Sequence, residues 1–370
     1  MQTHICLVSA QAAANLLPAL DKEIKPNQVV LVVSRSMSEK ADHMDAVLKE
    51  VGIATERILL SDEHDFNVTK NELLEWASSH EGGEVALNLT GGTKLMAIAA
   101  QTVASIAGWR TFYLDVDTDI VTWLDAPEPA TMKLHEQLRL KHYLQSYGFS
   151  LSRPVKQLQV PLEKQQMMDT LVRQIGSLEK SLSQLNWIAQ QAEDKRALRI
   201  SLTSEQSDSL SLQTLLRNFE EAGALNVEGD EIIFGDESDR QFVKGGWLEQ
   251  LTYQKVPLQI QDKAYSLEVQ DGRGVKNELD VAFMAGNRLF VVECKTARMD
   301  QPLAPKANDT LYKLAENCRR IGGAGTRGML VSYRSLRDTE KKLARALNID
   351  CVCGPDIVRL QEKMLEWVRR

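Results

Sequence analysis

The sequence predicts a mixed α/β protein made of three successive parts. In residues 1 to about 125, short apolar runs alternate with amphipathic helical stretches, which is typical of a mostly parallel, doubly wound sheet with helices on both faces. Beyond residue 241 the order is helix, three strands, helix, strand. The 370 residues suffice for several domains, and we divide them into residues 1–150, 151–240 and 241–370.

Composition and charge narrow the class of protein. The chain is 43% apolar and 26% charged, as in ordinary soluble globular proteins. It lacks a run of about 18 apolar residues and a signal-peptide core, so we expect a cytoplasmic protein without a membrane partner. The formal net charge is −7, yet from residue 241 onward 22 Lys and Arg stand against 16 Asp and Glu. A basic third part suits a domain that handles phosphates.

Cysteine and histidine usage excludes several kinds of catalytic site. Cys6 and Cys294 lie in apolar runs, Cys318 lies in a helical run, and Cys351 and Cys353 form a lone C-x-C, which cannot complete a tetrahedral zinc site. We expect all five to be reduced, structural thiols. All six histidines precede residue 241, which leaves the third part without a Ser/His/Asp or Cys/His mechanism.

The first part is expected to bind a ligand at its strand ends. Its strands are predicted at residues 4–8, 29–33, 57–60, 85–89 and 111–114, and its helices at 12–24, 38–51, 70–79 and 94–107. Ligands of parallel sheets bind beyond the carboxyl ends of the strands. Three of these ends carry small polar residues, and the candidate ligand-binding residues are Ser9, Ala10, Gln11, Ser36, Thr90, Gly91, Gly92, Thr93 and Lys94.

The loop before the helix at 94–107 is the most informative of the three. Gly91 and Gly92 let the backbone approach a ligand, Thr93 begins the helix, and Lys94 adds positive charge, so an anion site at a helix N-terminus is predicted. The spacing matches neither a Walker A loop nor G-x-G-x-x-G, which argues against a dinucleotide cofactor. The alternative is a plain glycine-rich turn capped by Thr93.

The middle part is predicted to be a helical connector. Helices are expected over residues 133–147 and 164–195, the second with a leucine stripe suited to packing. A helix at 210–222 followed by a hairpin with its turn at 228–230 resembles a winged helix. Because the helix has one Arg against two Glu, we favour a structural spacer over a DNA-reading module.

The third part centres on a hairpin over residues 278–295. Two apolar runs flank Gly286 and Asn287, a pair typical of a tight turn, and counting from that turn places Asp280 opposite Glu293 and Glu278 opposite Lys295. The other face carries apolar residues, namely Leu279, Val281, Phe283, Phe290, Val292 and Cys294. The remaining elements are expected at 247–253, 265–269, 309–320, 328–332 and 338–347.

The charges on this hairpin suggest chemistry. Like charges directly opposite each other repel, so Asp280 facing Glu293 is costly unless a cation lies between them. Mg²⁺ and Mn²⁺ prefer such oxygen ligands, and Lys295 on the same face is suited to steering a water or stabilising charge on a phosphate. The alternative is a solvent-facing hairpin with a Glu278–Lys295 ion pair.

Two family resemblances rest on these motifs. The hairpin resembles the PD-(D/E)xK nuclease core, with Leu279 where proline would stand. This implies a restriction-endonuclease-like fold, metal ligands at Asp280 and Glu293, and catalytic roles for Lys295 and, from the preceding helix, Glu249. The segment L-T-G-G-T-K-L-M resembles the ligand motif of CARF domains, which are Rossmann-like. By that match Thr93 and Lys94 would approach phosphates, while Ser9, Gln11 and Ser36 would line the pocket.

The pairing of the two resembles CARF nucleases of type III CRISPR systems. It implies a homodimer, cyclic tetra-adenylate as allosteric activator, Mn²⁺ or Mg²⁺ as cofactor, and a DNA or RNA substrate or both. The rival hypothesis is a ligand-sensing winged-helix transcriptional regulator with a degenerate nuclease domain. A third is hydrolysis of the cyclic ligand by the CARF-like domain itself.

Overall fold

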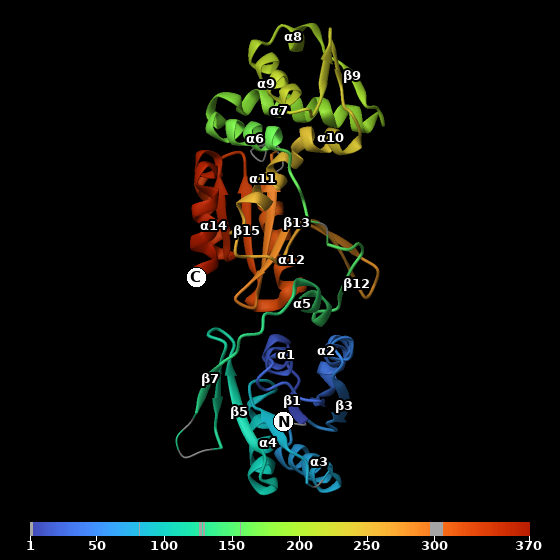
Figure 1. Cartoon of the computed structure of the whole chain (residues 1–370), viewed down its shortest axis with the longest axis vertical. Helices are drawn as coiled ribbons and strands as arrows, with labels where there is room; N and C mark the ends of the chain where they lie inside the picture. Colours follow the sequence, from blue (N-terminus) through green and yellow to red (C-terminus); the bar gives the residue numbers. More distant parts are fainter. Residues whose placement is uncertain (1–2, 81, 126–127, 129, 156, 297–305) are drawn as a thin grey trace. The chain divides into compact units, whose positions relative to one another are not determined.

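The computed structural model describes residues 3–80, 82–125, 128, 130–155, 157–296 and 306–370. The chain forms two compact units, shown with their elements in Figure 1. The first extends to Ser150 and includes Gln270–Val275 and Ile321–Gly323, and the second holds the rest. In the part of the chain that is described, no helix is long and apolar enough to cross a membrane. The three-part division by sequence stays a prediction.

The first unit is built on a seven-stranded sheet in the order β3-β2-β1-β4-β5-β6-β7. The five strands β1 to β5 are parallel neighbours, and the order reverses between β1 and β4, as in a doubly wound Rossmann-like fold. Its elements are β1 (Thr3–Leu7), α1 (Ala13–Leu20), β2 (Gln28–Val33), η1 (Arg35–Met37), α2 (Ser38–Glu50), β3 (Ala54–Leu59), α3 (Phe66–Ser79), β4 (Val85–Asn88), α4 (Lys94–Ala107), β5 (Arg110–Asp115), β6 (Ile120–Trp123), β7 (Thr131–Lys133) and α5 (Leu140–Ser146). The expected fold class is thus confirmed here.

Strand alternation distributes the helices over the two faces of this sheet. Ile5, Leu7 and Val30 point to one face, where they pack with Leu73 of α3 and Ala100 of α4. Helices α1 and α2 lie over the opposite face (Figure 1). One prediction is wrong at the unit's end. The helix expected over residues 133–147 forms only as α5. Lys133 ends strand β7, and the next backbone N–H groups, those of residues 134–136, donate to Asp119 and Asp21.

The second unit begins with two helices and a small sheet. Its first elements are α6 (Leu162–Arg173), α7 (Ile175–Asp194), β9 (Arg199–Ser201), α8 (Ser204–Ser207), α9 (Leu210–Glu221), β10 (Asn226–Glu228) and β11 (Glu231–Ile233). The predicted winged-helix-like helix and hairpin are present, and β9 joins them as a third strand. The single helix expected over 164–195 is wrong, because the chain bends at Gln174. The bend lets the apolar faces of both helices enter one core.

A six-stranded sheet forms the rest of the second unit, in the order β16-β15-β14-β13-β12-β8. Its elements are β8 (Phe149–Leu151), α10 (Glu237–Gln241), η2 (Phe242–Gly246), α11 (Trp247–Lys255), β12 (Lys263–Asp271), β13 (Lys276–Ala285), β14 (Arg288–Lys295), α12 (Lys306–Gly322), η3 (Gly323–Gly325), β15 (Arg327–Ser332), α13 (Asp338–Ala346), β16 (Ile349–Cys353), η4 (Gly354–Arg359) and α14 (Leu360–Arg369). The expected order from α11 to β15 is confirmed.

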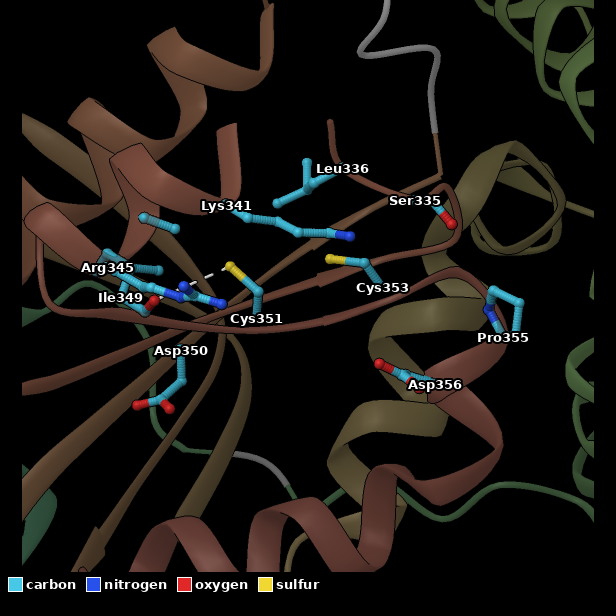
Figure 2. A pocket seen from close by; sticks show the side chains of 11 residues that line it. Ser335, Leu336, Lys341, Arg345, Ile349, Asp350, Cys351, Cys353, Pro355 and Asp356 are labelled. Carbon is cyan, nitrogen blue, oxygen red and sulfur yellow. Dashed lines mark hydrogen bonds between the residues drawn. The ribbon is translucent and has the colours of Figure 1, made fainter. Parts of the chain in front are cut away.

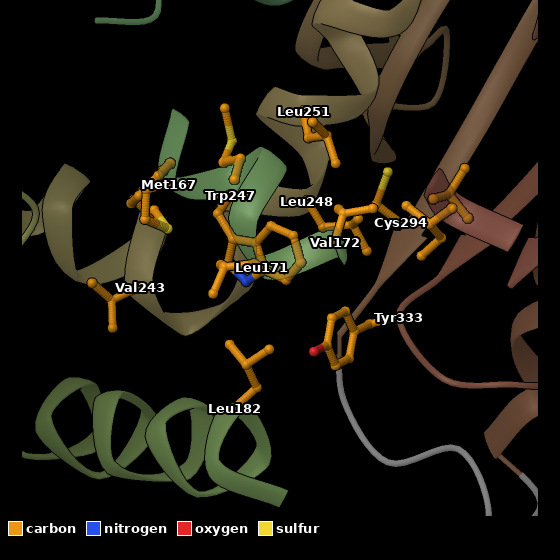
Figure 3. Packing of buried hydrophobic residues seen from close by; sticks show 14 of the residues in the cluster. Met167, Leu171, Val172, Leu182, Val243, Trp247, Leu248, Leu251, Cys294 and Tyr333 are labelled. Atoms are coloured by element: carbon orange, nitrogen blue, oxygen red, sulfur yellow. The ribbon is translucent and has the colours of Figure 1, made fainter. Parts of the chain in front are cut away.

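One core joins the connecting helices to this sheet. Trp247 at the start of α11 is fully buried, and its ring meets Tyr333, which follows β15, edge to face at 5.5 Å. Figure 3 shows Leu171 of α6 and Leu182 of α7 packed around Trp247. The Tyr333 hydroxyl also donates to the Ile175 carbonyl oxygen at 3.2 Å. Helix α7 is therefore held against the sheet by packing and by hydrogen bonding.

Candidate functional site

The β13–β14 hairpin has the register that the sequence predicts. Phe283 pairs with Phe290 and Ala285 with Arg288 across a turn in which Gly286 and Asn287 both have positive φ, at 52° and 57°. These angles are those of a type I′ turn, which matches the twist of the strands. The same register places Asp280 next to Glu293 across the two strands. The predicted apolar face is buried, from Leu279 at 1% exposed to Cys294 at 5%.

Three predicted site residues lie together at the end of this hairpin. The Asp280 carboxylate accepts a hydrogen bond from the backbone N–H of Cys294, with N to Oδ2 at 2.7 Å. Lys295 Nζ lies 2.6 Å from Glu293 Oε1 and 4.0 Å from Asp280 Oδ2, so the ammonium bridges the two carboxylates. The alternative Glu278–Lys295 ion pair is not adopted. Glu278 instead accepts a hydrogen bond from Ser266.

The fourth predicted residue, Glu249, arrives from α11. Leu248 and Leu251 of that helix are buried in the core, which turns Glu249 toward the hairpin charges. The helix is entered through the π-helical turn η2, where Gly245 has φ 154°. A Cβ on Gly245 would lie 2.4 Å from Thr296 Oγ1. This turn therefore needs glycine, and it sets where Glu249 lies.

Burial and mutual repulsion shift the charges of this cluster. Burial raises the pKa of Glu249 to about 7, the charges of Glu278 and Glu293 add to the shift, and that of Lys295 opposes it. Burial also raises the pKa of Asp280 well above its usual range, with Glu293 and Glu249 contributing. Burial alone would lower the pKa of Lys295, but the Glu293 and Asp280 carboxylates raise it above its ordinary value. The cluster thus has an excess of negative charge that a further cation would relieve.

A cavity of about 890 Å³ opens over these residues. It is lined by residues of α7, η2, α11 and the sheet strands β12 to β14, among them Glu249, Asp280 and Lys295. Sequence reasoning missed the contributions of Trp187, Lys244 and Thr296. Trp187 lies in the leucine-rich helix that is otherwise core, and Lys244 and Thr296 become site residues only through long-range packing. No local pattern marks any of the three.

The predicted ligand-binding residues of the first unit gather where β1 and β4 end. Ser9, Ala10 and Gln11 follow β1, and the loop 90–94 follows β4, its parallel neighbour. A Cβ on Gly91 would lie 2.1 Å from the Leu7 carbonyl oxygen, and Gly92 has φ 72°. Both glycines are therefore required for the close approach of the loop to β1. Thr93 caps α4 by accepting from the backbone N–H of Met96 at 3.2 Å, which is the capping role that the alternative interpretation gave it.

The side chains at this edge differ in whether they are free to contact a ligand. Gln11, Thr93 and Lys94 are exposed. The Thr90 hydroxyl donates to Asn88 Oδ1 at 2.6 Å and accepts from the backbone N–H of Leu114 at 2.8 Å. Thr90 thus holds the loop in place.

The end of β2 adds a further group to this edge. Ser36, in η1, bonds the Ser34 hydroxyl at 3.1 Å. Arg35, exposed between these two serines, is a basic group at this edge that was not among the predicted residues.

A second hollow of the second unit surrounds the C-x-C motif. Figure 2 shows Cys351 and Cys353 on β16 with Lys341 and Arg345 of α13 beside them. All five cysteines of the chain are free thiols, as predicted. Residues two apart on a strand are about 6.6 Å apart, at the upper end of what a disulfide spans. This hollow contains none of the predicted site residues.

Comparison with known proteins identifies the fold and both domains. A crystal structure of protein VC1899 from Vibrio cholerae superposes with TM-score 0.89 at 24% identity, covering 100% of this chain and 97% of that one. Can2 from Sulfobacillus thermosulfidooxidans, solved in complex with cyclic tetra-adenylate, gives 0.82 at 24% identity, covering 100% and 99%. A type III CRISPR defence DNA nuclease activated by cyclic oligoadenylate gives 0.58 at 20% identity, covering 90% and 45%. These likenesses show a shared fold.

A comparison with curated protein sequences finds no match. The family models are specific: residues 3–143 match the Card1 CARF domain, and residues 236–370 match the Card1-like endonuclease domain. The two matches occur in one chain in the same order as the two folds described above. The chain therefore carries a Card1 CARF domain followed by a Card1-like endonuclease domain.

Proposed function

We propose that this chain is a metal-dependent nuclease that cleaves phosphodiester bonds of DNA or RNA in type III CRISPR defence when a cyclic oligoadenylate binds its CARF domain. Cyclic tetra-adenylate is the activator we propose, and the cytoplasm is the place of action. The observation that carries the proposal is the half-buried cluster of Glu249, Asp280, Glu293 and Lys295 within an endonuclease domain that shares its chain with a CARF domain.

The carboxylates of Asp280 and Glu293 are suitable ligands for Mg²⁺ or Mn²⁺. Among the described residues no group of three or more His, Cys, Asp and Glu side chains is arranged to hold a metal ion. Mg²⁺, however, is commonly bound through one or two carboxylates, with water and substrate phosphate completing the shell. Asp280 and Glu293 are two such carboxylates, and their excess negative charge, expressed in the raised pKa of Asp280, favours a divalent cation. When bound, the metal would polarise the phosphate and lower the pKa of a coordinated water.

The protein's own residues would orient the metal ligands, the phosphate and the attacking water. The Cys294 N–H fixes one oxygen of Asp280, which pre-orients the carboxylate. Lys295, held charged by its acidic neighbours, would stabilise charge on the phosphate and orient the attacking water. Glu249 would support the two ligands from the helix side. The fixed positions of these groups on a buried hairpin and a packed helix would supply the required geometry.

The first unit would bind the cyclic ligand at the edge where β1 and β4 end. Phosphates would lie at the α4 N-terminus, near Thr93 and Lys94, over the loop that Gly91 and Gly92 bring close to β1. Ser9, Ala10, Gln11 and Ser36 would line the rest of the pocket, and Thr90 would hold the loop. Can2, which shares the fold, was solved with cyclic tetra-adenylate, which supports this ligand.

The proposed active form is a homodimer built on α4. Ile98 and Ile106 of this helix are 59% and 66% exposed, and with Leu89 and Ala97 they line an apolar hollow that starts one turn from Lys94. A second copy would cover this face and bring two ligand loops together. Ligand binding would then act by population shift, favouring the dimer arrangement that binds the ligand more tightly.

The test is cleavage of supercoiled plasmid and of labelled single-stranded RNA and DNA with Mn²⁺, in the presence and absence of cyclic tetra-adenylate. The variant is Glu293→Ala, and the matched control is Glu231→Gln, a surface carboxylate of β11 paired with Arg199. We expect ligand-dependent cleavage in wild type and control, and its loss in Glu293→Ala. Absence of cleavage by wild type on every substrate would refute the nuclease assignment. Cleavage unaffected by the ligand would refute the activation.

The regulator hypothesis is not favoured. It predicts a decayed nuclease site, whereas all four site residues are present and clustered. The helix α9 that would read DNA buries Leu212, Leu215 and Phe219 and offers Arg217 as its one basic residue. Neither observation supports sequence-specific DNA recognition.

A further inference from the structure

Helix α7 presents a second face that is separate from its core stripe. Its core face consists of Leu178, Leu182, Leu185, Ile188 and Ala189, all buried. Ser183, Asn186, Trp187 and Gln190, spaced i, i+3, i+4 and i+7, form one stripe, and all four line the cavity that holds the candidate catalytic cluster. The helix therefore faces the core on one side and the cavity on the other.

Trp187 is the large apolar residue of this stripe. It is 57% exposed, whereas its neighbours Leu185 and Ile188 are 0% and 1% exposed. Every other large apolar side chain of α7 is buried. Single exposed apolar side chains are ordinary on a protein surface, so exposure alone does not mark a site. What distinguishes Trp187 is that its exposed ring lines the cavity that Asp280 and Lys295 also line, where a bound ligand would meet it.

The polar members of the stripe are engaged within the protein. The Ser183 hydroxyl donates to the Glu179 carbonyl oxygen at 2.9 Å. With its side-chain amide turned so that the nitrogen faces the backbone carbonyls, Asn186 donates to the Lys244 carbonyl oxygen at 3.1 Å, and its oxygen accepts from Thr296 Oγ1 at 3.0 Å. These bonds tie α7 to η2 and to the end of β14. The indole of Trp187 is thereby held on a rigid helix in the wall of the cavity that Lys295 and Asp280 also line.

We propose that Trp187 is a positioning residue on which an unpaired base of the nucleic-acid substrate stacks next to the scissile phosphate. Aromatic side chains stack on bases of any sequence because every base has a π face. A base in a duplex is already stacked on both sides, so only an unpaired or flipped base can use this surface. The inference rests on the proposed nuclease function and adds a binding role for a residue outside the endonuclease family match.

The test measures binding separately from cleavage. Full-length protein with cyclic tetra-adenylate and EDTA is titrated into short labelled single-stranded DNA and RNA, for wild type, Trp187→Ala, Trp187→Phe and Leu258→Ala. Leu258 is a matched control because it is an exposed apolar residue, at 80%, that does not line the cavity. We expect Trp187→Ala to bind roughly ten-fold or more weakly, as for loss of one base–aromatic stack, and Trp187→Phe to retain most of the affinity.

A ladder of oligonucleotides with one abasic site at each position identifies the stacked base. In wild type one position should weaken binding when its base is removed, and in Trp187→Ala that position should lose its effect. Equal affinity of wild type and Trp187→Ala overturns the inference, and so does a change in oligomeric state without a change in affinity. If Trp187→Ala binds normally while wild type still cleaves, the stacking role fails and the nuclease function stands. If wild type binds no single-stranded oligonucleotide, the stacking role fails, and the cleavage assay on plasmid, RNA and DNA decides the nuclease function separately.

Discussion

The backbone N–H of Cys294 donates to Asp280 Oδ2 at 2.7 Å, which ties the candidate metal ligand on β13 to the strand that carries Glu293 and Lys295. Asparagine keeps an oxygen that can accept this bond but carries no charge. Asp280→Asn should therefore retain the local geometry while losing the charge on which cleavage depends.

For Asp280→Asn we expect cleavage to fall by at least about 100-fold, the scale seen when one charge-stabilising group is removed from an active site. The unfolding temperature should stay level or rise, because the high pKa of Asp280 reports the cost of its buried charge. Cleavage assays and thermal unfolding check the two halves. A variant that loses stability together with activity would assign Asp280 a structural role.

Gly245→Ala tests the glycine-dependent turn before Glu249. The new Cβ meets Thr296 Oγ1 at 2.4 Å, and φ 154° is strained for any L-residue other than glycine. We expect a loss of about 1–3 kcal/mol in the free energy of unfolding and up to about 100-fold slower cleavage from misplacement of Glu249. Gly272→Ala, where nothing lies within 4 Å of the added Cβ, is the control. Equal behaviour of the two variants would contradict the role of the turn.

His4 predicts a dependence of stability on pH in the first unit. Burial lowers its pKa from 6.5 to about 4, so the folded state disfavours the charged imidazolium. Above about pH 6.5 the imidazole is neutral in both the folded and the unfolded state, and the free energy of unfolding is at its full value. As the pH falls toward 4, the unfolded state takes up the proton first, and the free energy of unfolding drops by about 3 kcal/mol in all. His4→Leu should remove this part of the acid-side loss, as measured by denaturant unfolding between pH 7 and 4. Parallel pH profiles for wild type and variant would disprove it.

The proposed dimer face is tested on α4. Ile98→Asp combined with Ile106→Asp places two charges on the face that a second copy would cover, so the dimer should dissociate and activation by cyclic tetra-adenylate should be lost. Light scattering and cleavage assays measure these outcomes. Leu59→Asp, at a similarly exposed apolar residue of β3, should leave the dimer intact. A double variant that stays dimeric would show that copies associate elsewhere.

Local patterns predicted the parts of the fold in which near neighbours in sequence decide the structure. The Gly286–Asn287 turn and the alternation around it were sufficient for the register that brings Asp280 and Glu293 together. The glycines and Thr93 were likewise sufficient for the loop before α4. Features decided by distant partners were not predictable. Strand β7 exists because β6 pairs with it, and the bend at Gln174 lets two helices share one core.

The same distinction separates the predicted site residues from the missed ones. Glu293 and Lys295 belong to one short motif. Trp187 reads as one more apolar residue of a leucine-rich helix until the fold shows which face of α7 meets the cavity. Thr90 was predicted to bind ligand, and only the hydrogen bonds that its hydroxyl donates to Asn88 and accepts from Leu114 reveal that this hydroxyl is occupied.

The attachment of α7 to the sheet has a consequence for engineering. Trp247 is buried against Leu171 and Leu182, Tyr333 bonds the start of α7, and Glu179 pairs with Arg334 at 2.9 Å. A fragment cut at residue 236 would expose the indole of Trp247 and lose one wall of the cleavage cavity. A chimera that joins this endonuclease domain to a different ligand-binding domain should therefore be joined before Leu162. The transferred segment then includes helices α6 and α7.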